Sequence, residues 1–196
     1  RFKFIGFLEE AIRTKELEDV NRQIERAYFE LEDTNLRLIH ELKERRLAEE
    51  RIGHLIYYDE LTGIFNRKKV MEDISLLLLD KNEKFAVLFV DLDKFKSIND
   101  KFGHEAGDTV LKNVAMRLKG IIGEKDIISR IGGDEFIIIL RYLESAEQAE
   151  KVAQAIVTEM NVVFTLKNRR FLVGASIGIS IYPEHGTTAD VLINKA

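Results

Sequence analysis

The sequence predicts an α+β domain, with a ferredoxin-like or palm-type antiparallel sheet and flanking helices, preceded by a long coiled-coil helix. The long helix is predicted because no Gly or Pro occurs between Gly6 and Gly53, a stretch dense in Glu, Arg, Lys and Leu. The sheet is predicted because strand-like and helix-like segments from about Asp59 onward follow the order β-α-β-β-α-β. The 196 residues, 45% hydrophobic and 33% charged, suit one modest globular domain with an elongated charged element.

Composition excludes several classes of protein. The net charge of -4 gives no general basic surface for nucleic acid, so a bound nucleotide would need metal ions or a local nest of backbone amides. Cysteine is absent, which excludes disulfides, thiolate metal sites and a Cys nucleophile. The longest apolar runs, such as residues 76–79, are too short to cross a bilayer, and no signal peptide is visible. We therefore expect a cytoplasmic chain without a membrane segment, although the full protein could be membrane-anchored.

The long helix carries a heptad seam. Apolar residues and two asparagines alternate at spacings of four and three for nearly four repeats. An Asn at an a position pairs with its counterpart across a parallel dimer, which fixes register and strand number at a cost in stability. An amphipathic helix lying on its own domain is the alternative, but such a helix usually has a wider apolar face. The a positions are Asn21, Tyr28, Asn35 and Leu42, and the d positions are Leu17, Ile24, Leu31 and Leu38.

The seam weakens beyond residue 42. Arg45 and Glu49 fall in line with it, whereas Leu47, Ile52 and Leu55 suggest a shifted phase. Such a break resembles a stutter, which locally changes the winding of a coiled coil. It would lie where a twisting signal enters the next domain.

The remaining chain alternates between helical and extended segments. Amphipathic spacing predicts helices, and continuous apolar runs predict buried strands. A Gly-Gly pair between two apolar strands predicts a hairpin, and the last helix is expected to continue beyond Ala196. The predicted helices are residues 66–79, 105–122, 146–160 and a segment from about 187, and the predicted strands are 85–90, 127–131, 136–140, 162–166 and 171–182.

Two carboxylates follow the first of these strands. Residues 85–90 are apolar and run directly into Asp91-Leu92-Asp93. Acids at i and i+2 lie on one side of a strand, where palm-type nucleotidyltransferases present hard oxygen ligands to Mg²⁺ beside substrate phosphates. A solvated strand end would explain the same pattern, and this motif alone does not separate the two.

A second pair of acids, Asp134-Glu135, follows Gly132-Gly133 at the predicted hairpin turn. The glycines allow a tight turn with positive φ and leave room for a closely approaching ligand, so the acids would stand beside a bound triphosphate. An ordinary Gly-Gly-Asp hairpin is the alternative. Both flanking strands are apolar, however, and two acids without a function would be a poor choice for stability on a central hairpin.

The segment from Lys94 to Asp108 contains groups suited to a guanine base. Asn99 offers an amide that both donates and accepts, and Asp108 offers a carboxylate for the N1–H and N2–H₂ edge. A pocket that hydrogen-bonds this edge rejects adenine, because its polar groups would be left unpaired. A turn residue at Asn99 and a polar helix position at Asp108 remain the alternatives.

Several motifs, taken in order, resemble the GGDEF family of diguanylate cyclases. The resemblance covers residues 57–196 and implies the condensation of two GTP molecules into cyclic di-GMP, with release of pyrophosphate. The motifs are Asp59-Glu60-Leu61-Thr62-Gly63 with Asn66-Arg67, residues 91–108, Arg130-Ile131-Gly132-Gly133-Asp134-Glu135-Phe136, Ser176-Ile177-Gly178-Ile179-Ser180, and Tyr182-Pro183.

The resemblance implies a metal and catalytic site. Asp91, the backbone carbonyl of Leu92, and Asp134 would hold Mg²⁺ or Mn²⁺. Glu135 would be a catalytic-site acid whose duty, metal support or proton acceptance, stays open. Asp93 matches a position that is often acidic, and its role is not assigned.

The resemblance also implies how the nucleotide is bound. Asn99 and Asp108 would read guanine, and the backbone of Lys94, Phe95 and Lys96 would cradle the β- and γ-phosphates. Two domains, each with one GTP, would face each other, so the coiled coil would set the catalytic homodimer. An inactive GGDEF domain that binds GTP or dimerises is the alternative, and a purely structural coiled-coil adaptor would leave the acids unexplained.

Two features depart from the family pattern. Basic residues that bind phosphates in the family's last helix would lie beyond Ala196. The Arg-x-x-Asp of the inhibitory product site is replaced by Gly123-Glu124-Lys125-Asp126, which keeps the acid and loses the arginine. Arg130 and His104 are expected to organise the hairpin and the turn.

The sequence therefore divides into three segments. Residues 1–15 weakly resemble the last strand of a PAS sensor domain and its exit into a signalling helix, and residues 1–12 are assigned to the possible end of an upstream sensor domain. Residues 13–56 form the coiled-coil signalling helix, and residues 57–196 form the GGDEF domain, which is expected to be truncated at its C-terminus.

Overall fold

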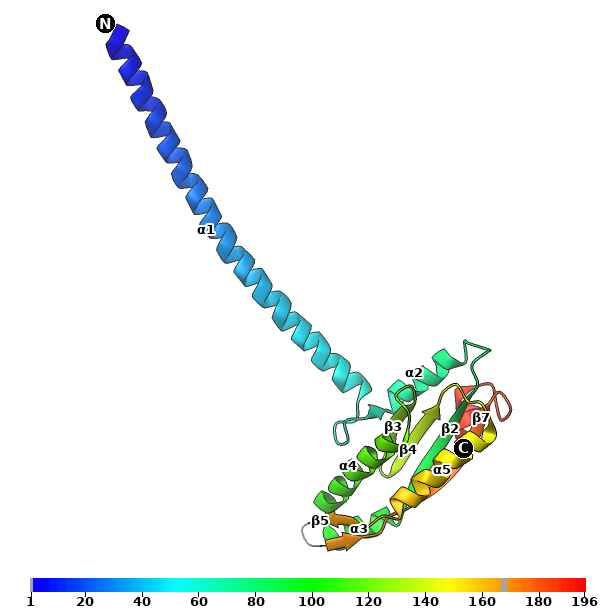
Figure 1. Cartoon of the computed structure of the whole chain (residues 1–196). Helices are drawn as coiled ribbons and strands as arrows, with labels where there is room; N and C mark the ends of the chain where they lie inside the picture. Colours follow the sequence, from blue (N-terminus) through cyan, green and yellow to red (C-terminus); the bar gives the residue numbers. More distant parts are fainter. Residues whose placement is uncertain (1, 167–168) are drawn as a thin grey trace. The chain divides into compact units, whose positions relative to one another are not determined.

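The computed structural model describes residues 2–166 and 169–196, with side chains described for 13–49, 51–165, 170 and 172–196 (Figure 1). The chain divides into two compact units, Arg1–Ile52 and Gly53–Ala196. Helix α1 (Phe2–Tyr57) accounts for the first unit and ends just inside the second. The helix predicted between Gly6 and Gly53 is therefore confirmed.

The predicted seam of α1 is exposed in the single chain. Its six apolar side chains range from 49% exposed at Ile24 to 71% exposed at Tyr28. At the predicted phase break, Arg45 Nε lies 2.9 Å from Glu49 Oε1, so these two polar seam residues pair within the helix. The structure is helical from Phe2, and the PAS remnant predicted for residues 1–12 is not confirmed. No helix in the described part of the chain is both long enough and apolar enough to span a membrane.

The second unit is a five-stranded sheet with helices on both faces and a small separate hairpin. Its sheet strands are β1 (Phe65–Asn66), β2 (Phe85–Asp93), β3 (Ile127–Gly132), β4 (Glu135–Leu140) and β7 (Gly174–Tyr182). Its helices are α2 (Arg67–Leu77), α3 (Phe95–Phe102), α4 (His104–Ile121), α5 (Ala146–Met160) and α6 (Ala189–Lys195), and its hairpin is β5 (Phe164–Leu166) with β6 (Arg169–Phe171).

The sheet has the strand order β1-β3-β4-β2-β7. Strand β2 lies between β4 and β7 and is antiparallel to both, and β3 is antiparallel to β4. These four strands with α4 and α5 form the predicted β-α-β-β-α-β arrangement, so the ferredoxin-like, palm-type fold is confirmed. The two-residue strand β1 pairs in parallel with β3 at the edge and was not predicted.

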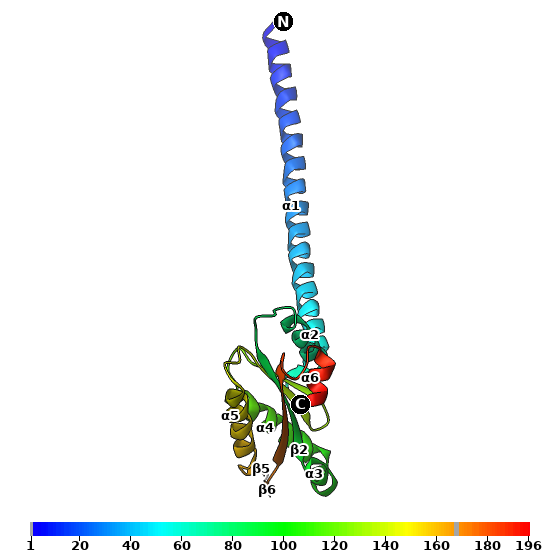
Figure 2. The ribbon, with the colours of Figure 1, turned by 90° about the vertical axis from the view of Figure 1, so that its right-hand side faces the viewer.

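Side chains of β2 alternate between two cores, as the period of a strand requires. Ala86, Leu88 and Val90 belong to the core shared with α4 and α5, whereas Phe85 and Val87 belong to the core shared with α2 and α6. Figure 2 shows α4 and α5 on one side of the strands and α6 on the other. Because both faces of β2 are covered, only its end is free to carry polar side chains.

The structure departs from the prediction at three further elements. The segment after β2 was not assigned a helix, but it forms α3. The strand predicted over 162–166 is shortened to β5, and the strand predicted over 171–182 is broken at residues 172 and 173 into β6 and β7. Continuous β-forming residues predicted one strand, whereas the chain changes sheets at this point.

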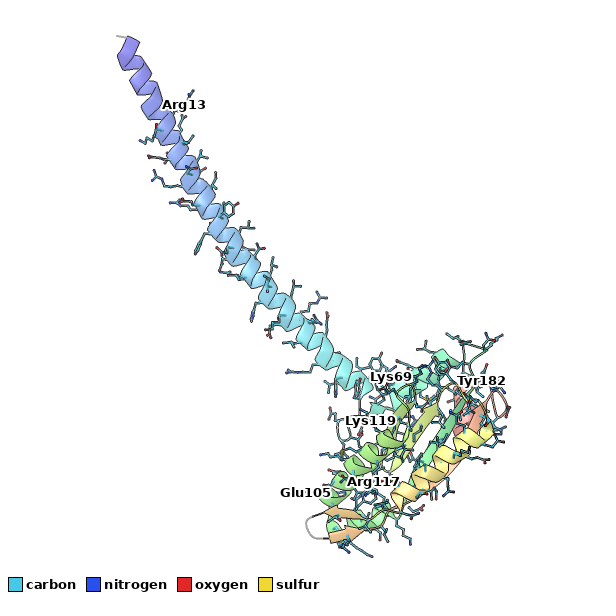
Figure 3. All side chains as sticks on the ribbon, in the orientation of Figure 1. Arg13, Lys69, Glu105, Arg117, Lys119 and Tyr182 are labelled. Carbon is cyan, nitrogen blue, oxygen red and sulfur yellow. The ribbon has the colours of Figure 1, made fainter. Side chains whose placement is uncertain are left out.

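Arg117 on α4 holds the region before the small hairpin (Figure 3). Its guanidinium lies 3.7 Å from the ring centroid of Phe164 and donates hydrogen bonds to the carbonyls of Glu159 and Val162 at 2.8 and 2.7 Å. A partly buried cation on an aromatic ring with satisfied donors is a stable arrangement. Arg117 is therefore part of the framework of the domain.

Candidate active site

Strands β2 and β4 bring the two acidic motifs together. Their antiparallel register pairs Asp91 with Glu135, which places these side chains on the same face of the sheet. The backbone N–H of Leu92 donates to the carbonyl of Asp134 at 3.3 Å. The acids predicted from two distant motifs therefore meet at one end of the central strands.

The carboxylates in this cluster repel one another. Desolvation, followed by the negative charges of Asp134 and Asp93, raises the pKa of Asp91 above its ordinary value. Such crowding of acids at a strand end disfavours the empty, fully ionised state. A cation between them would relieve the repulsion.

Glu135 lines a pocket of about 250 Å³ beside this cluster. Its floor is formed by apolar side chains of the sheet, including Phe89 and Ile137, and Arg67 of α2 brings a positive charge to the wall. In the sequence, Arg67 stands only as part of a GGDEF-like motif. Its position after Asn66, the N-cap of α2, is what places it at the pocket.

Arg130 stabilises the Gly132-Gly133 turn by hydrogen bonding, as predicted. Gly133 has a φ of +52°, a left-handed conformation that favours glycine. Nε and Nη2 of Arg130 donate to the carbonyl of Gly133 at 3.0 and 2.8 Å, and Nη1 donates to both carboxylate oxygens of Asp59 at 3.1 Å. Arg130 thus ties the acidic turn to the loop after α1.

Asp59 is the centre of that loop. Its Oδ1 accepts hydrogen bonds from the backbone N–H of Thr62 at 2.9 Å and from the Thr62 hydroxyl at 2.6 Å. Burial alone would raise the pKa of Asp59, but the hydrogen bonds from Thr62 and Arg130 outweigh it and lower that pKa. Through Asp59, the segment Asp59 to Gly63 is therefore fixed to the turn that carries the second pair of acids.

Asp93 is held by the neighbouring strand β7. Its Oδ1 accepts a hydrogen bond from the Ser176 hydroxyl at 2.8 Å. Gly174 lies opposite Asp93 in the register, and a Cβ there would come within 2.5 Å of its Oδ2. In the sequence, Ser176 stands only within a GGDEF-like motif and Gly174 only within a predicted strand, and nothing local in the sequence indicates this contact.

The predicted nucleotide-binding residues lie on α3, on α4 and in the turns that begin them. Lys94, the N-cap of α3, has a φ of +61°, so the chain turns sharply just after the acids. Asn99 on α3 has a buried side-chain oxygen that lacks a hydrogen-bond partner among the described residues. Asp108 on α4 is exposed. An unpartnered buried acceptor beside an exposed acid is unusual in a framework and suits a site that receives hydrogen bonds from a ligand.

Within the described part of the chain, no group of three or more His, Asp or Glu side chains is arranged to hold a metal ion. Asp91 and Asp134 supply two carboxylates. That donor set fits a hard ion such as Mg²⁺, which usually takes one or two carboxylates and completes its shell with water and substrate phosphates.

The sequence profile described as "Diguanylate cyclase, GGDEF domain" matches residues 56–196. This chain belongs to the GGDEF family. The match includes both acidic strand ends, the Asp59 loop and the α3–α4 segment. The family predicted from the sequence is confirmed.

Known GGDEF proteins include near relatives of this chain. The diguanylate cyclase TpbB of Pseudomonas aeruginosa PAO1 is 40% identical over 173 residues, which cover 84% of this chain and 40% of TpbB. A solved structure of the TpbB GGDEF domain is 42% identical with a TM-score of 0.68, over 70% of this chain and 83% of that one. The chain therefore spans well under half the length of this curated relative.

The coiled coil and GGDEF domain of DgcB from Caulobacter crescentus, solved in complex with c-di-GMP, has a TM-score of 0.76. The likeness covers 85% of this chain and 90% of that one. At 21% identity it shows the fold alone.

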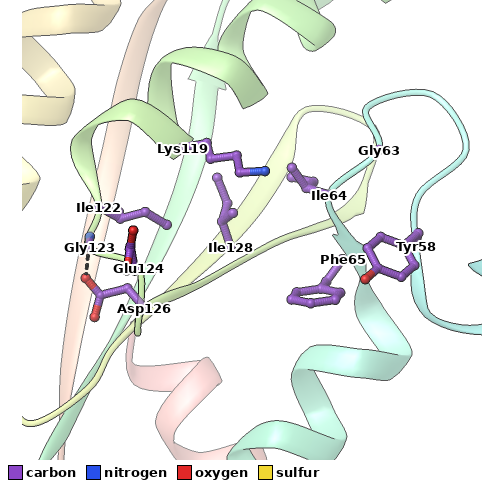
Figure 4. A pocket seen from close by; sticks show the side chains of 10 residues that line it. All are labelled: Tyr58, Gly63, Ile64, Phe65, Lys119, Ile122, Gly123, Glu124, Asp126 and Ile128. Atoms are coloured by element: carbon purple, nitrogen blue, oxygen red, sulfur yellow. Dashed lines mark hydrogen bonds between the residues drawn. The ribbon is translucent and has the colours of Figure 1, made fainter.

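The turn Gly123–Asp126, where the family resemblance predicted a degenerate inhibitory motif, is held by hydrogen bonds to the side chain of Asp126. Oδ2 of Asp126 accepts the backbone N–H of Gly123 at 2.8 Å, and Oδ1 accepts the backbone N–H of Arg141 at 3.0 Å. Figure 4 shows this turn beside a pocket of about 350 Å³. Ile122 and Ile128 give the pocket an apolar wall. The predicted loss of the arginine thus coincides with an acid that is already occupied by backbone donors.

Proposed function

We propose that this chain is the catalytic part of a diguanylate cyclase, which condenses two GTP molecules into cyclic di-GMP and releases pyrophosphate. The observation that supports this most is the meeting of Asp91 with the Asp134-Glu135 pair at adjacent strand ends. Membership of the GGDEF family and the activity named for TpbB support the same function.

Asp91, the backbone carbonyl of Leu92, and Asp134 would hold the divalent metal that GGDEF cyclases generally use, which we propose is Mg²⁺ or Mn²⁺. When bound, the cation would neutralise charge on the phosphate oxygens. Two carboxylates and a carbonyl leave positions for water and phosphate oxygens, so the cation would be held most tightly together with the nucleotide.

The segment after β2 would bind the rest of the nucleotide. The left-handed turn at Lys94 opens α3, and the backbone of Lys94, Phe95 and Lys96 would cradle the β- and γ-phosphates. Asn99 and Asp108 would read the guanine edge. The unpartnered oxygen of Asn99 supports this assignment, because a buried acceptor that lacks a donor gains a hydrogen bond only when a ligand arrives.

In the proposed reaction, the 3′-oxygen of one GTP attacks the α-phosphorus of the other. The hydroxyl proton passes to a base, and the bond from the α-phosphorus to pyrophosphate breaks. A second identical step closes the ring. Glu135 would accept the proton or support the cation. A Glu135→Gln variant separates these duties, because lost turnover with unchanged metal affinity would indicate proton transfer.

Each domain would supply half of the reaction centre, so two copies of the chain must face each other. We propose that α1 forms a parallel coiled-coil dimer through its exposed seam. An upstream sensor domain would control how the two GGDEF domains of the dimer are oriented toward each other. The asparagines at two a positions support a parallel dimer. We propose a cytoplasmic location for the domain, where its substrate GTP would be supplied.

The direct test is to incubate the chain with GTP and Mg²⁺ and to look for cyclic di-GMP by chromatography. We expect product from the parent chain and none from Asp134→Asn. Asp80→Asn, a change in an exposed loop, is the matched control and should keep parent activity. A parent chain that binds GTP tightly but forms no product would favour the inactive, GTP-binding or dimerising module instead.

A further inference from the structure

The turn between α3 and α4 contains a close contact between the side chain of Asn99 and the backbone of Gly107. A Cβ placed on Gly107 would lie 1.9 Å from Oδ1 of Asn99 and 2.9 Å from its Cγ. It would also lie 3.1 Å from Cζ of Phe95. Cβ atoms do not approach other heavy atoms within 3.0 Å, so the amide of Asn99 occupies the space that any side chain at position 107 would need.

The backbone of α4 does not itself require glycine at this position. Gly107 lies within the helix and does not have the positive φ that favours glycine at Gly103 or Gly133. Glycine is among the least favourable residues inside a helix because it loses the most backbone entropy. The contact with Asn99 is thus the feature of the structure that accounts for a glycine here.

Packing, with no hydrogen bond from the described residues, restrains the oxygen end of the Asn99 amide. Its Oδ1 is buried and has no hydrogen-bond partner among the described residues. The backbone carbonyl of Asn99 is engaged separately, because it accepts the N–H of Gly103 at 2.9 Å. The surface of Gly107 is therefore one of the main restraints on where the amide lies.

We propose that Gly107 is a positioning residue that seats the Asn99 amide for guanine recognition. This inference rests on the proposed guanine site. A methyl group at position 107 would displace the amide, so its hydrogen bonds to the base would be weakened or misdirected. The acids at the strand ends lie on other elements and would keep their places. Guanine recognition would then fall more than the binding of a nucleotide with another base.

The test uses 3′-deoxy-GTP and 3′-deoxy-ATP with Mg²⁺, because nucleotides without a 3′-hydroxyl bind but cannot react. Calorimetry on the full chain would compare Gly107→Ala with Gly120→Ala. Gly120 lies on the same helix, and a Cβ there meets no atom within 4 Å. We expect Gly107→Ala to weaken 3′-deoxy-GTP binding by at least about tenfold, and Gly120→Ala to leave it within about twofold. The preference for guanine over adenine should shrink only in Gly107→Ala.

Asn99→Ala and the double variant Asn99→Ala/Gly107→Ala show whether Gly107 acts through Asn99. The double variant removes both contacts with Asn99 and leaves only the milder 3.1 Å approach to Cζ of Phe95, so it should fold even if Gly107→Ala does not. It should bind 3′-deoxy-GTP as weakly as Asn99→Ala and no more weakly. Additive losses would mean that Gly107 has a separate structural role and would overturn the inference.

The two possible failures are distinguishable. A parent chain that prefers 3′-deoxy-GTP, together with a Gly107→Ala variant that binds it equally well, would overturn the positioning role and leave the guanine site intact. A parent chain that binds both nucleotides equally would overturn the guanine site, and with it this inference.

Discussion

At the scale of single residues, Asp91 is a side chain whose negative charge is costly in the folded chain. Its carboxylate lies among other acids, and its pKa is raised by desolvation and by Asp134 and Asp93. The ionised form is therefore less favourable in the folded chain than in the unfolded chain. This penalty is absent below the unfolded pKa of about 4 and grows as the pH rises through the raised folded pKa.

We therefore expect Asp91→Asn to abolish turnover and yet to raise the thermal stability of the metal-free chain at neutral pH. The gain in stability should disappear when the pH falls below about 4, because Asp91 is then protonated in both states. Thermal unfolding of both chains at the two pH values, without divalent cations, measures the effect. A variant that keeps near-parent turnover, or that melts lower than the parent at neutral pH, would contradict this reading.

For Asp59 we expect the opposite dependence of folding stability on pH, because hydrogen bonds from Thr62 and Arg130 lower its pKa. A carboxyl with a lowered folded pKa stabilises the fold above the unfolded pKa, and that stability is lost as the pH falls through the folded value. Asp59→Asn should cost roughly 1–3 kcal/mol at neutral pH, with a smaller loss in acid. Denaturant unfolding at several pH values measures this. A loss that does not vary with pH would refute the ionic role, and Asp80→Asn serves as the control.

The positions of the proposed metal-binding acids could be predicted from the sequence better than the contacts of the side chains around them. Asp91 and Asp134 were predictable because each follows an apolar strand directly, which is a local pattern. Ser176 was not, because it lies 83 residues from Asp93 and its contact depends on the register of β2 with β7. The seat of Asn99 on Gly107 depends in the same way on how α3 packs against α4.

At the scale of elements, periodicity predicted the long segments and failed at short ones. Helix α5 has the predicted bounds, Ala146–Met160, because its apolar spacing continues over four turns. Helix α3 was missed because it has only eight residues and begins at the left-handed Lys94. Strand β1 was missed because two residues carry no periodic signal, and it exists only by pairing with β3.

The predicted coiled coil is testable on α1 itself. We expect a parallel dimer in which Asn21 and Asn35 each face their counterparts. Changing both to Leu should raise the melting temperature and loosen the choice of oligomeric state, since buried Asn pairs trade stability for specificity. Analytical ultracentrifugation of the parent and the double variant measures this. A parent chain that sediments as a monomer at micromolar concentration would contradict the prediction that the heptad seam of α1 forms a dimer.

The Gly123–Asp126 turn predicts weak product inhibition. Its acid already accepts backbone hydrogen bonds from Gly123 and Arg141, and no guanidinium occupies position 123. Calorimetry should show little binding of cyclic di-GMP, and Gly123→Arg should strengthen binding at least about tenfold relative to Gly123→Ala. Micromolar binding by the parent that disappears in Asp126→Ala would contradict this prediction.

At the scale of the whole molecule, the proposed reaction needs two copies of the chain that act together. Each GGDEF unit brings one set of acids, on β2 and β4, and one α3–α4 segment. Neither set alone would place two GTP molecules with each 3′-oxygen opposite the other's α-phosphorus. The exposed seam of α1 would supply the pairing that the reaction needs.

Mixing the parent chain with Asp91→Asn tests this claim most directly. The two chains are combined at equal concentrations under conditions that allow subunit exchange, and cyclic di-GMP formation is compared with that of the parent alone at the same total concentration. If every reaction centre needs intact acids from both copies, only parent–parent dimers are active, and the rate should fall to about a quarter. A rate of about half would mean that each chain acts alone, and would contradict a reaction centre built from two copies.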